Sequence, residues 1–596
     1  MLRTICFLLR VSSYCLFVTL LISVSAPSLA GIQTNGERVE IKLGRSPIGN
    51  YLAGRHAQAR HDVNAALKFL LAALKGLPNA PDLRESTFFL LVSEGRIKEA
   101  LPLARKLIRE NPKSPIANLT LAVEALRKRD YASVIARFKD DSHTGLNSFT
   151  QPFIKAWALA GQGKSDGAQE ALAKLDRRES TKGFYDAHRA LLLDFMNDPS
   201  AEAAYNALLD KDISGSFQVI QHIGQYYERH GQIEKARAIY DRSRSSMPGT
   251  TLFDVAYTRL KSGVRPLKIL RSASDGVAAA LFTVANSLRL QRAKGTALAL
   301  VRLALHLRPN FGLAMVLVAE ILEEDKRYAD ANVVYERVAL DSPFRTSSDL
   351  GLAKNLGSLG QTDRAIALYT EISNRRSHDP EPLIQLGNLL RRLKRWEDAI
   401  KVYTDAIARI GIIEKRFWHV LYARGIAYER GNRWPDAERD LLDALKFKPE
   451  QPFILNYIGY SWIDQGIHLK RAQKMIRRAA ELRPDDGYII DSLGWGYYKL
   501  GKYEEAVKEL ERSIEIRPED PIINDHLGDA YWRVGRRLEA RFQWRRSLSL
   551  DPKKDLDEKI RKKLKFGLGV PNSKEQQPYS EKDPVGGGNP SVRNKI

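Results

Sequence analysis

Near its C-terminus the chain carries almost the same stretch twice. Residues 491–507 read DSLGWGYYKLGKYEEAV and residues 525–541 read DHLGDAYWRVGRRLEAR, so matching positions lie 34 residues apart. A fixed period of this length is typical of a two-helix unit that stacks on copies of itself, because one such unit cannot bury its apolar face alone. The repeat therefore predicts an array of paired helices.

The apolar residues within one copy follow a helical spacing. Leu493, Tyr497 and Leu500 fall at i, i+4 and i+7, which places them on one stripe of a helix. Gly494 is small, so a second helix can approach closely there. Pro518 is expected to end that second helix, because proline has no backbone N–H to donate.

The same frame of glycine, alanine, tyrosine and proline recurs upstream, for example at Gly425, Ala437 and Pro449. With these motifs the chain resembles the tetratricopeptide repeat (TPR) family over roughly residues 47–554. The resemblance implies an all-α fold, a right-handed superhelical solenoid of stacked helix–turn–helix repeats. It also implies a concave groove in which partner proteins bind.

Breaks in the pattern divide the chain, which at 596 residues is too long for one compact core. The end of the chain is polar and rich in glycine and proline, a composition typical of disorder. We predict a signal peptide at 1–30, a linker at 31–46, an N-terminal and partly degenerate TPR segment at 47–250, an interruption at 251–277, a C-terminal TPR segment at 278–554, a basic capping helix at 555–570 and a disordered tail at 571–596.

The N-terminal segment has the pattern of a secretory signal. Arg3 and Arg10 precede an uncharged apolar run, and Ser28 and Ala30 occupy the small-residue positions of a cleavage site. The run is shorter than the roughly 20 residues of a membrane span. We expect an exported, periplasmic protein, with an uncleaved inner-membrane anchor as the alternative. Both cysteines lie in this segment, so the mature chain would have no disulfide.

The rest of the sequence contains no motif that calls for catalysis. HExxH and GxSxG are absent, and GQGKS at 161–165 lacks the earlier glycine of a phosphate loop, since Ala158 stands there. We predict a protein that is not an enzyme and needs no cofactor or metal. The net charge of +23 favours anionic partners, but export argues against nucleic acid.

In the repeats near the C-terminus, the first helix of each pair carries a second stripe, made of aromatic and acidic residues. This stripe lies nearly opposite the apolar stripe on which the helices pack. In the TPR family these positions line the groove. The alternative is that the aromatics pack between neighbouring first helices or under the tail. The predicted partner-binding residues are Asn456, Tyr460, Asp491, Trp495, Tyr498, Asp525, Asp529, Trp532 and Arg533.

Two functions remain open at this point. The first is a non-catalytic scaffold or adaptor of the bacterial cell envelope that binds other proteins in its groove. The stretches NYIGYSWIDQG and DGYIIDSLGWGYYKLGKYEEAV resemble long exported bacterial TPR adaptors. That resemblance implies an envelope protease or a peptidoglycan-modifying enzyme as partner. The second is a basic protein that binds an anionic envelope polymer or lipid surface through its charge.

Overall fold

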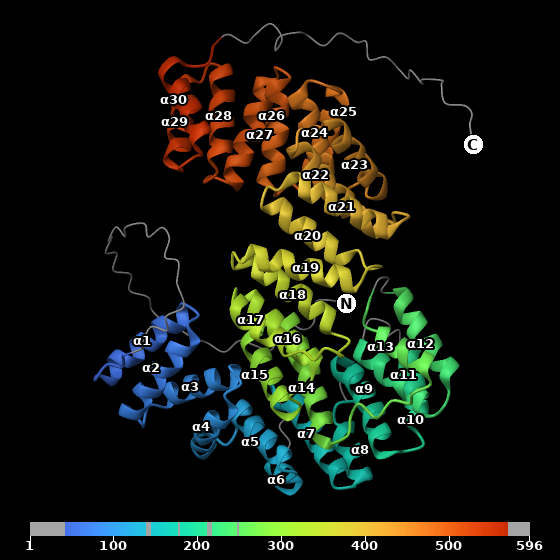
Figure 1. Cartoon of the computed structure of the whole chain (residues 1–596). Coiled ribbons are helices and arrows are strands. Elements are labelled where there is room, and N and C mark those ends of the chain that lie inside the picture. The colour runs from blue at the N-terminus through green and yellow to red at the C-terminus, as the bar shows by residue number, and fades with distance from the viewer. Residues whose placement is uncertain (1–41, 139–144, 177–178, 211–216, 247–249, 570–596) are drawn as a thin grey trace, which may run out of the picture. The chain divides into compact units, whose positions relative to one another are not determined.

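The structure is a computed structural model that describes residues 42–138, 145–176, 179–210, 217–246 and 250–569 (Figure 1). Every regular element in these ranges is a helix, thirty of them α-helical. The predicted all-α fold, a solenoid of stacked helix pairs, is confirmed. The predicted signal peptide, most of the predicted linker and the predicted tail lie outside the described residues. None of the described helices is long and apolar enough to cross a bilayer.

The chain divides into two compact units, residues 1–87 and 88–596. The first unit holds α1 (Pro47–Ala59) and α2 (Val63–Gly76), and the boundary falls within α3 (Pro81–Ser93). Gly54 lets α1 and α2 meet, because a Cβ there would lie 2.8 Å from Leu70 Cγ. The side chain of Asp62 accepts a hydrogen bond from the Ala65 amide and so caps α2.

The second unit begins with helices of uneven length. They are α4 (Ile97–Glu110), α5 (Pro115–Arg127), α6 (Tyr131–Arg137), α7 (Asn147–Gly161), α8 (Ser165–Ala173), α9 (Glu179–Met196), α10 (Ala201–Leu209), α11 (Phe217–Arg229), α12 (Ile233–Ser246) and α13 (Asp254–Ser262).

After the helix-free stretch 263–272 the unit continues as a more regular series. Its helices are α14 (Ala273–Leu290), α15 (Lys294–Leu307), α16 (Gly312–Glu324), α17 (Tyr328–Glu336), α18 (Arg345–Ser358), α19 (Thr362–Arg375), α20 (Glu381–Arg392), α21 (Trp396–Ile410), α22 (Trp418–Arg430), α23 (Trp434–Phe447), α24 (Pro452–Gln465), α25 (Leu469–Leu482), α26 (Gly487–Lys499), α27 (Tyr503–Ile516), α28 (Pro521–Arg533), α29 (Arg537–Ser549) and α30 (Lys554–Phe566). A short 3-10 turn, Lys415–Phe417, precedes α22.

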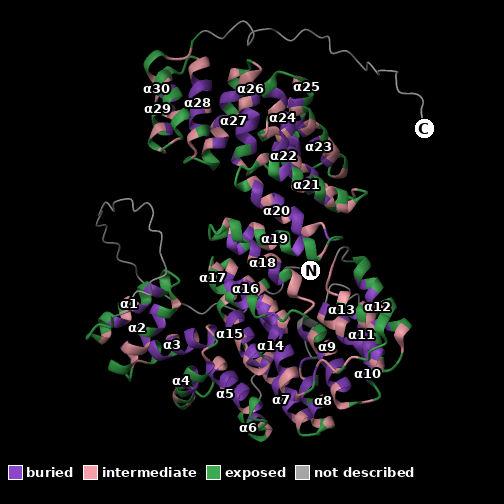
Figure 2. Ribbon diagram, in the orientation of Figure 1, coloured by how far each residue is buried: buried purple, intermediate pink, exposed green. Residues whose placement is uncertain are grey.

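The repeated residues explain why these helices form pairs. Asp520 caps α28 by accepting a hydrogen bond from the Ile522 amide at 2.9 Å. Gly501 takes the left-handed conformation, φ +75°, that the turn between α26 and α27 requires. A Cβ at Gly494 would lie 2.6 Å from Leu510 Cγ, so only glycine allows this approach. The buried residues lie mainly where paired helices face each other (Figure 2).

The second series of helices packs beside the first. Helix α14 contacts α7, and α15 contacts α5. Gly276 of α14 lies directly on the indole ring of Trp157 in α7. At another point, Arg327, which precedes α17, donates two hydrogen bonds to the Glu94 carboxylate, at 2.7 and 2.8 Å. The predicted interruption, 251–277, thus contains α13, the helix-free stretch and the first turn of α14.

Candidate partner-binding groove

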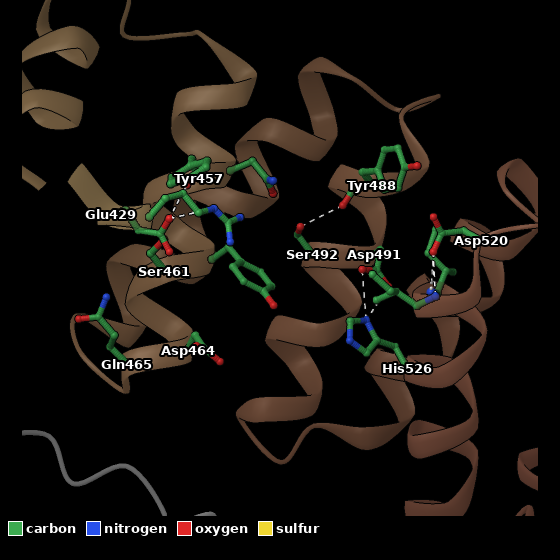
Figure 3. Close-up of a pocket in the computed structure, with 15 residues that line it drawn as sticks. Glu429, Tyr457, Ser461, Asp464, Gln465, Tyr488, Asp491, Ser492, Asp520 and His526 are labelled. Carbon is green, nitrogen blue, oxygen red and sulfur yellow. Dashed lines mark hydrogen bonds and ion pairs between the residues drawn. The ribbon is translucent and has the colours of Figure 1, made fainter. Parts of the chain in front are cut away.

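A cavity of about 460 Å³ lies on the first helices of four consecutive repeats, α22, α24, α26 and α28 (Figure 3). Three of these first helices are neighbours, because α24 contacts α26 and α26 contacts α28. The second helices α23, α25 and α27 contribute none of its described lining residues. We call this cavity the groove. Its position matches the face on which the sequence predicted partner binding.

Three of the nine predicted residues line the groove: Asn456, Tyr460 and Asp491. The Oδ1 atom of Asn456 is buried and has no hydrogen-bond partner among the described residues. Burial, together with the carboxylates of Asp464 and Asp491, raises the pKa of Tyr460 to about 12. Asp491 is buried and accepts a hydrogen bond from His526 Nδ1 at 2.9 Å.

Other residues that line the groove were not predicted from the sequence. His526 follows the repeated aspartate of α28, where the preceding repeat has Ser492, so only the comparison of copies hinted at it. Tyr457 donates a hydrogen bond to Glu429 Oε2 at 2.9 Å across adjacent repeats. Glu429 is also within 3.2 Å of Arg430 Nε. The groove therefore presents aromatic rings with carboxylates, two amides and one guanidinium, a mixture suited to a peptide segment.

Trp495 and Tyr498 lie beside the groove without lining it. Their rings stack at 4.6 Å with an interplanar angle of 6°. Trp495 also stacks on His526, at 4.0 Å and 14°. His526 therefore joins the groove to this aromatic stack. Both predicted aromatics are half-buried, so part of each ring is already used in packing between first helices.

Asp525 and Asp529 are buried beneath the last helix. Lys563 of α30 donates to Asp525 at 2.8 Å and to Asp529 at 2.7 Å. The indole Nε1 of Trp544 donates to Asp529 Oδ1 at 2.9 Å. We call these four residues the lysine cluster. The sequence could not indicate Lys563 as a partner, because it lies outside the repeat frame.

The remaining predicted residues contact the segment that follows α30. Trp532 Nε1 donates to the Leu568 carbonyl at 3.3 Å. Arg533 donates to Tyr498 Oη at 3.2 Å and to the Gly569 carbonyl at 2.7 Å. The structure thus brings Asn456, Tyr460 and Asp491 to an open groove. Asp525, Asp529, Trp532 and Arg533 instead contact α30 and residues 568–569. A role of the latter in partner binding stays a prediction.

Asp529 of the lysine cluster and His526 of the groove both have raised pKa values. Burial and the neighbouring Asp525 charge raise the pKa of Asp529 to about 6, although the Lys563 charge acts in the opposite direction. Burial alone would lower the pKa of His526, but the Asp491 carboxylate holds it above its ordinary value. Both groups therefore bind a proton more tightly in the folded protein than in the unfolded chain.

We expect the last repeats to gain stability on acidification from about pH 8 to about pH 4. His526 contributes stability that is present below about pH 6.5 and lost as the pH rises through its raised folded pKa. Asp529 weakens the fold as the pH rises from about 4 to about 6, because its ionised form is buried. Urea unfolding at several pH values measures this. Asp529→Asn should flatten the dependence between about pH 4 and 6; an unchanged slope would contradict the assignment.

No group of three or more His, Cys, Asp or Glu side chains that could hold a metal ion occurs in the part of the chain that the structure describes.

Comparisons with known proteins match parts of this chain. Residues 350–412 and 384–453 match a family model described as tetratricopeptide repeat, and residues 496–535 match one described as TPR repeat. The TPR repeat-containing protein PA4667 of Pseudomonas aeruginosa is 27% identical over 200 residues, which are 32% of this chain and 31% of that protein. The chain thus spans under a third of the length of this curated relative.

Solved structures are similar to the chain at low sequence identity. The APC/C hetero-tetramer Cut9–Hcn1 is 14% identical, covers 88% of this chain and 97% of its own, and has a TM-score of 0.36. YrrB, described as a TPR protein with an unusual peptide-binding site, is 20% identical, covers 33% of this chain and 97% of its own, and has a TM-score of 0.27.

Proposed function

Because the chain is a TPR repeat protein in its middle and C-terminal parts, and such proteins generally bind other proteins, we propose that it is a scaffold that holds a partner segment in the groove. TPR repeats are typically non-catalytic, so the proposed role is binding alone. The observation that carries the proposal is the groove itself. Four consecutive first helices line it with side chains that change from repeat to repeat, while the packing residues recur.

The chemistry of the groove supports a peptide as ligand. Tyr457 and Tyr460 supply aromatic area, which anchors many protein interfaces. The buried Oδ1 of Asn456 lacks a donor, and an unpaired buried acceptor costs free energy until one arrives. A backbone N–H of a bound segment is a suitable donor once the amide turns toward it.

The cellular setting belongs to the same proposal. The N-terminal pattern of charged, apolar and small residues favours export to the periplasm, with an uncleaved anchor in the inner membrane as the alternative. There the scaffold would act as an adaptor of the cell envelope, with a protease or a peptidoglycan-modifying enzyme as partner. N-terminal sequencing of the protein from fractionated cells tests the location, since cleavage after Ala30 is expected.

Tyr460→Ala is expected to weaken partner binding about thirtyfold while the fold persists. Truncating an aromatic anchor typically costs about 2 kcal/mol of binding, and each factor of ten corresponds to about 1.4 kcal/mol. Partners are first identified by capture from envelope extract and mass spectrometry, and the Kd is then measured with the purified partner. Thermal melting checks that the variant is folded.

Phe542→Ala is the matched control for this variant. Phe542 lies on the second helix α29, is 65% exposed and does not line the groove. Its truncation should leave the Kd unchanged. A partner that binds Tyr460→Ala as tightly as wild type would place the interface elsewhere and refute the groove as the site.

A second candidate function rests on the outer face of α30. Lys559, Lys562 and Lys565 are exposed there, and the whole chain carries a net charge of +23. This face would bind an anionic envelope polymer or lipid surface by charge. Such binding falls steeply with ionic strength because of screening, whereas binding through aromatic anchors in the groove changes little. Measuring the affinity for the captured ligand at low and at high salt distinguishes the two candidate functions.

A further inference from the structure

A second cavity, of about 420 Å³, lies between α9, α10, α11 and α14 of the second unit. It shares no described residue with the groove. It forms at the place where the second series of helices packs beside the first, since α14 contacts both α7 and α9. Clefts between packed parts of a chain are common ligand sites, and this volume falls in the range of about 300–1,000 Å³ for small-molecule pockets. We call it the junction cavity.

The lining of the junction cavity is mainly apolar and carries no permanent charge. No Asp, Glu, Lys or Arg side chain is among its described lining residues. Burying an ionised ligand group in such surroundings is costly without an opposite charge. The lining selects against a charged ligand. The main apolar residues are Phe184, Leu191, Leu208, Phe282 and Leu290.

Two histidines are among the polar residues of this cavity. The others are uncharged: Tyr205, Gln218, Thr283, Asn286 and Ser287. His188 is only 2% exposed and packs its ring against Phe153 at 4.5 Å. Its Nδ1 atom is buried and has no hydrogen-bond partner among the described residues. His222, also buried, lines the same cavity from α11. Burial lowers the pKa of both histidines to about 3, so both rings are neutral at ordinary pH.

The unpaired Nδ1 of His188 is itself buried, so a ligand in the adjoining cavity reaches it once the imidazole ring turns toward the cavity. An unpaired buried nitrogen next to such a space calls for a partner from outside the chain. In a neutral imidazole, Nδ1 is either a donor or an acceptor, depending on the tautomer. A hydroxyl group can serve both cases, because it donates one hydrogen bond and accepts others. A carbonyl serves only one of them, and a carboxylate would in addition bring a charge that nothing in the lining neutralises.

We propose that the junction cavity binds a small, uncharged, largely apolar molecule that carries a hydroxyl group, and that the His188 ring turns so that its Nδ1 bonds this hydroxyl. This site is independent of the groove and of partner binding. The apolar part of the ligand would lie against the phenylalanine and leucine side chains. The affinity would come from burying this apolar surface away from water. Water filling the cavity is the competing occupant that the experiment must exclude.

The probe for this site is 1-naphthol, an apolar double ring with one hydroxyl. In water it loses its hydroxyl proton in the excited state, whereas a water-poor site suppresses this loss, so its emission reports entry into the cavity. Titration of the purified protein should show one saturable site. Ala187→Phe, which fills the cavity from α9, should abolish the signal, and Ala132→Phe on the exposed face of α6 should not.

His188→Leu tests the hydroxyl contact itself. It should weaken 1-naphthol about five- to tenfold, the loss of one buried hydrogen bond. Naphthalene, measured by displacement of 1-naphthol, should bind the variant at least as well as wild type. Each variant is checked by thermal melting, and Val219→Phe from α11 replaces Ala187→Phe if that protein does not fold. No saturable binding to wild type, or binding that survives a folded, filled cavity, overturns the proposal.

Discussion

Lys563→Met is expected to destabilise the last repeats by about 3–5 kcal/mol. The change removes the only described cation that contacts both Asp525 and Asp529, and breaking a buried ion pair leaves an uncompensated charge. The two carboxylates raise the pKa of Lys563 against the opposing effect of burial, so the ammonium is charged and bound. Repeat arrays unfold locally, so amide hydrogen exchange of α28–α30 is the appropriate measurement.

Lys559→Met is the matched control, since Lys559 is exposed on the same helix. It should leave exchange in α28–α30 unchanged. A second comparison adds Asp525→Asn and Asp529→Asn to Lys563→Met, which removes the unpaired charges and should restore part of the protection. Equal exchange in Lys563→Met and wild type would show that α30 is held by its apolar contacts alone.

The repeat frame was enough to predict the architecture of the C-terminal half. The period of 34 residues placed each first helix, its partner and the turn between them, because the same few residues determine these contacts in every copy. The pattern predicted a close approach of two helices at Gly494, which lies against Leu510. It also predicted the turn at Gly501, which has a left-handed conformation. The position of the groove followed from the same frame, since side chains opposite the packing stripe gather on one face.

The contents of the site were harder to predict, for a physical reason. Aspartates at matching positions have different environments: Asp491 accepts from His526, whereas Asp525 accepts from Lys563. Lys563 comes from a helix beyond the last repeat, so no periodicity relates it to the aspartates. The residue pattern of one helix predicts which side chains share a face, but not which other segment of the chain packs over that face. Hence the sequence identified the face but not which part of it is open.

The packing of the second series beside the first could not be predicted either. It depends on contacts between residues far apart in the chain, in the stretches where the repeat pattern is weak. Trp157 and Gly276 belong to such stretches, and neither occupies a position that the repeat frame marks. The junction cavity arises from the same packing. The sequence did not indicate that its two histidines lie together, because nothing in their local sequence relates His188 to His222.

Trp157→Ala should therefore be among the most destabilising single changes, by about 3–5 kcal/mol. Trp157 is fully buried, packs on Phe195 at 5.5 Å and supports the α7–α14 contact. Its Nε1 has no hydrogen-bond partner among the described residues. Trp157→Phe, which keeps an aromatic ring and removes that unpaired donor, should consequently cost much less. Thermal melting and urea unfolding compare the two variants.

Gly276→Ala tests the same contact from the opposite helix. A Cβ at Gly276 would overlap the Trp157 ring, so the change alone should be destabilising through overpacking. In the Trp157→Ala background the ring is gone and the added methyl group has room, so Gly276→Ala should there be neutral or stabilising. This non-additivity requires the two residues to touch. Additive costs would mean that α14 does not pack on α7, and that the second series of helices does not lie beside the first.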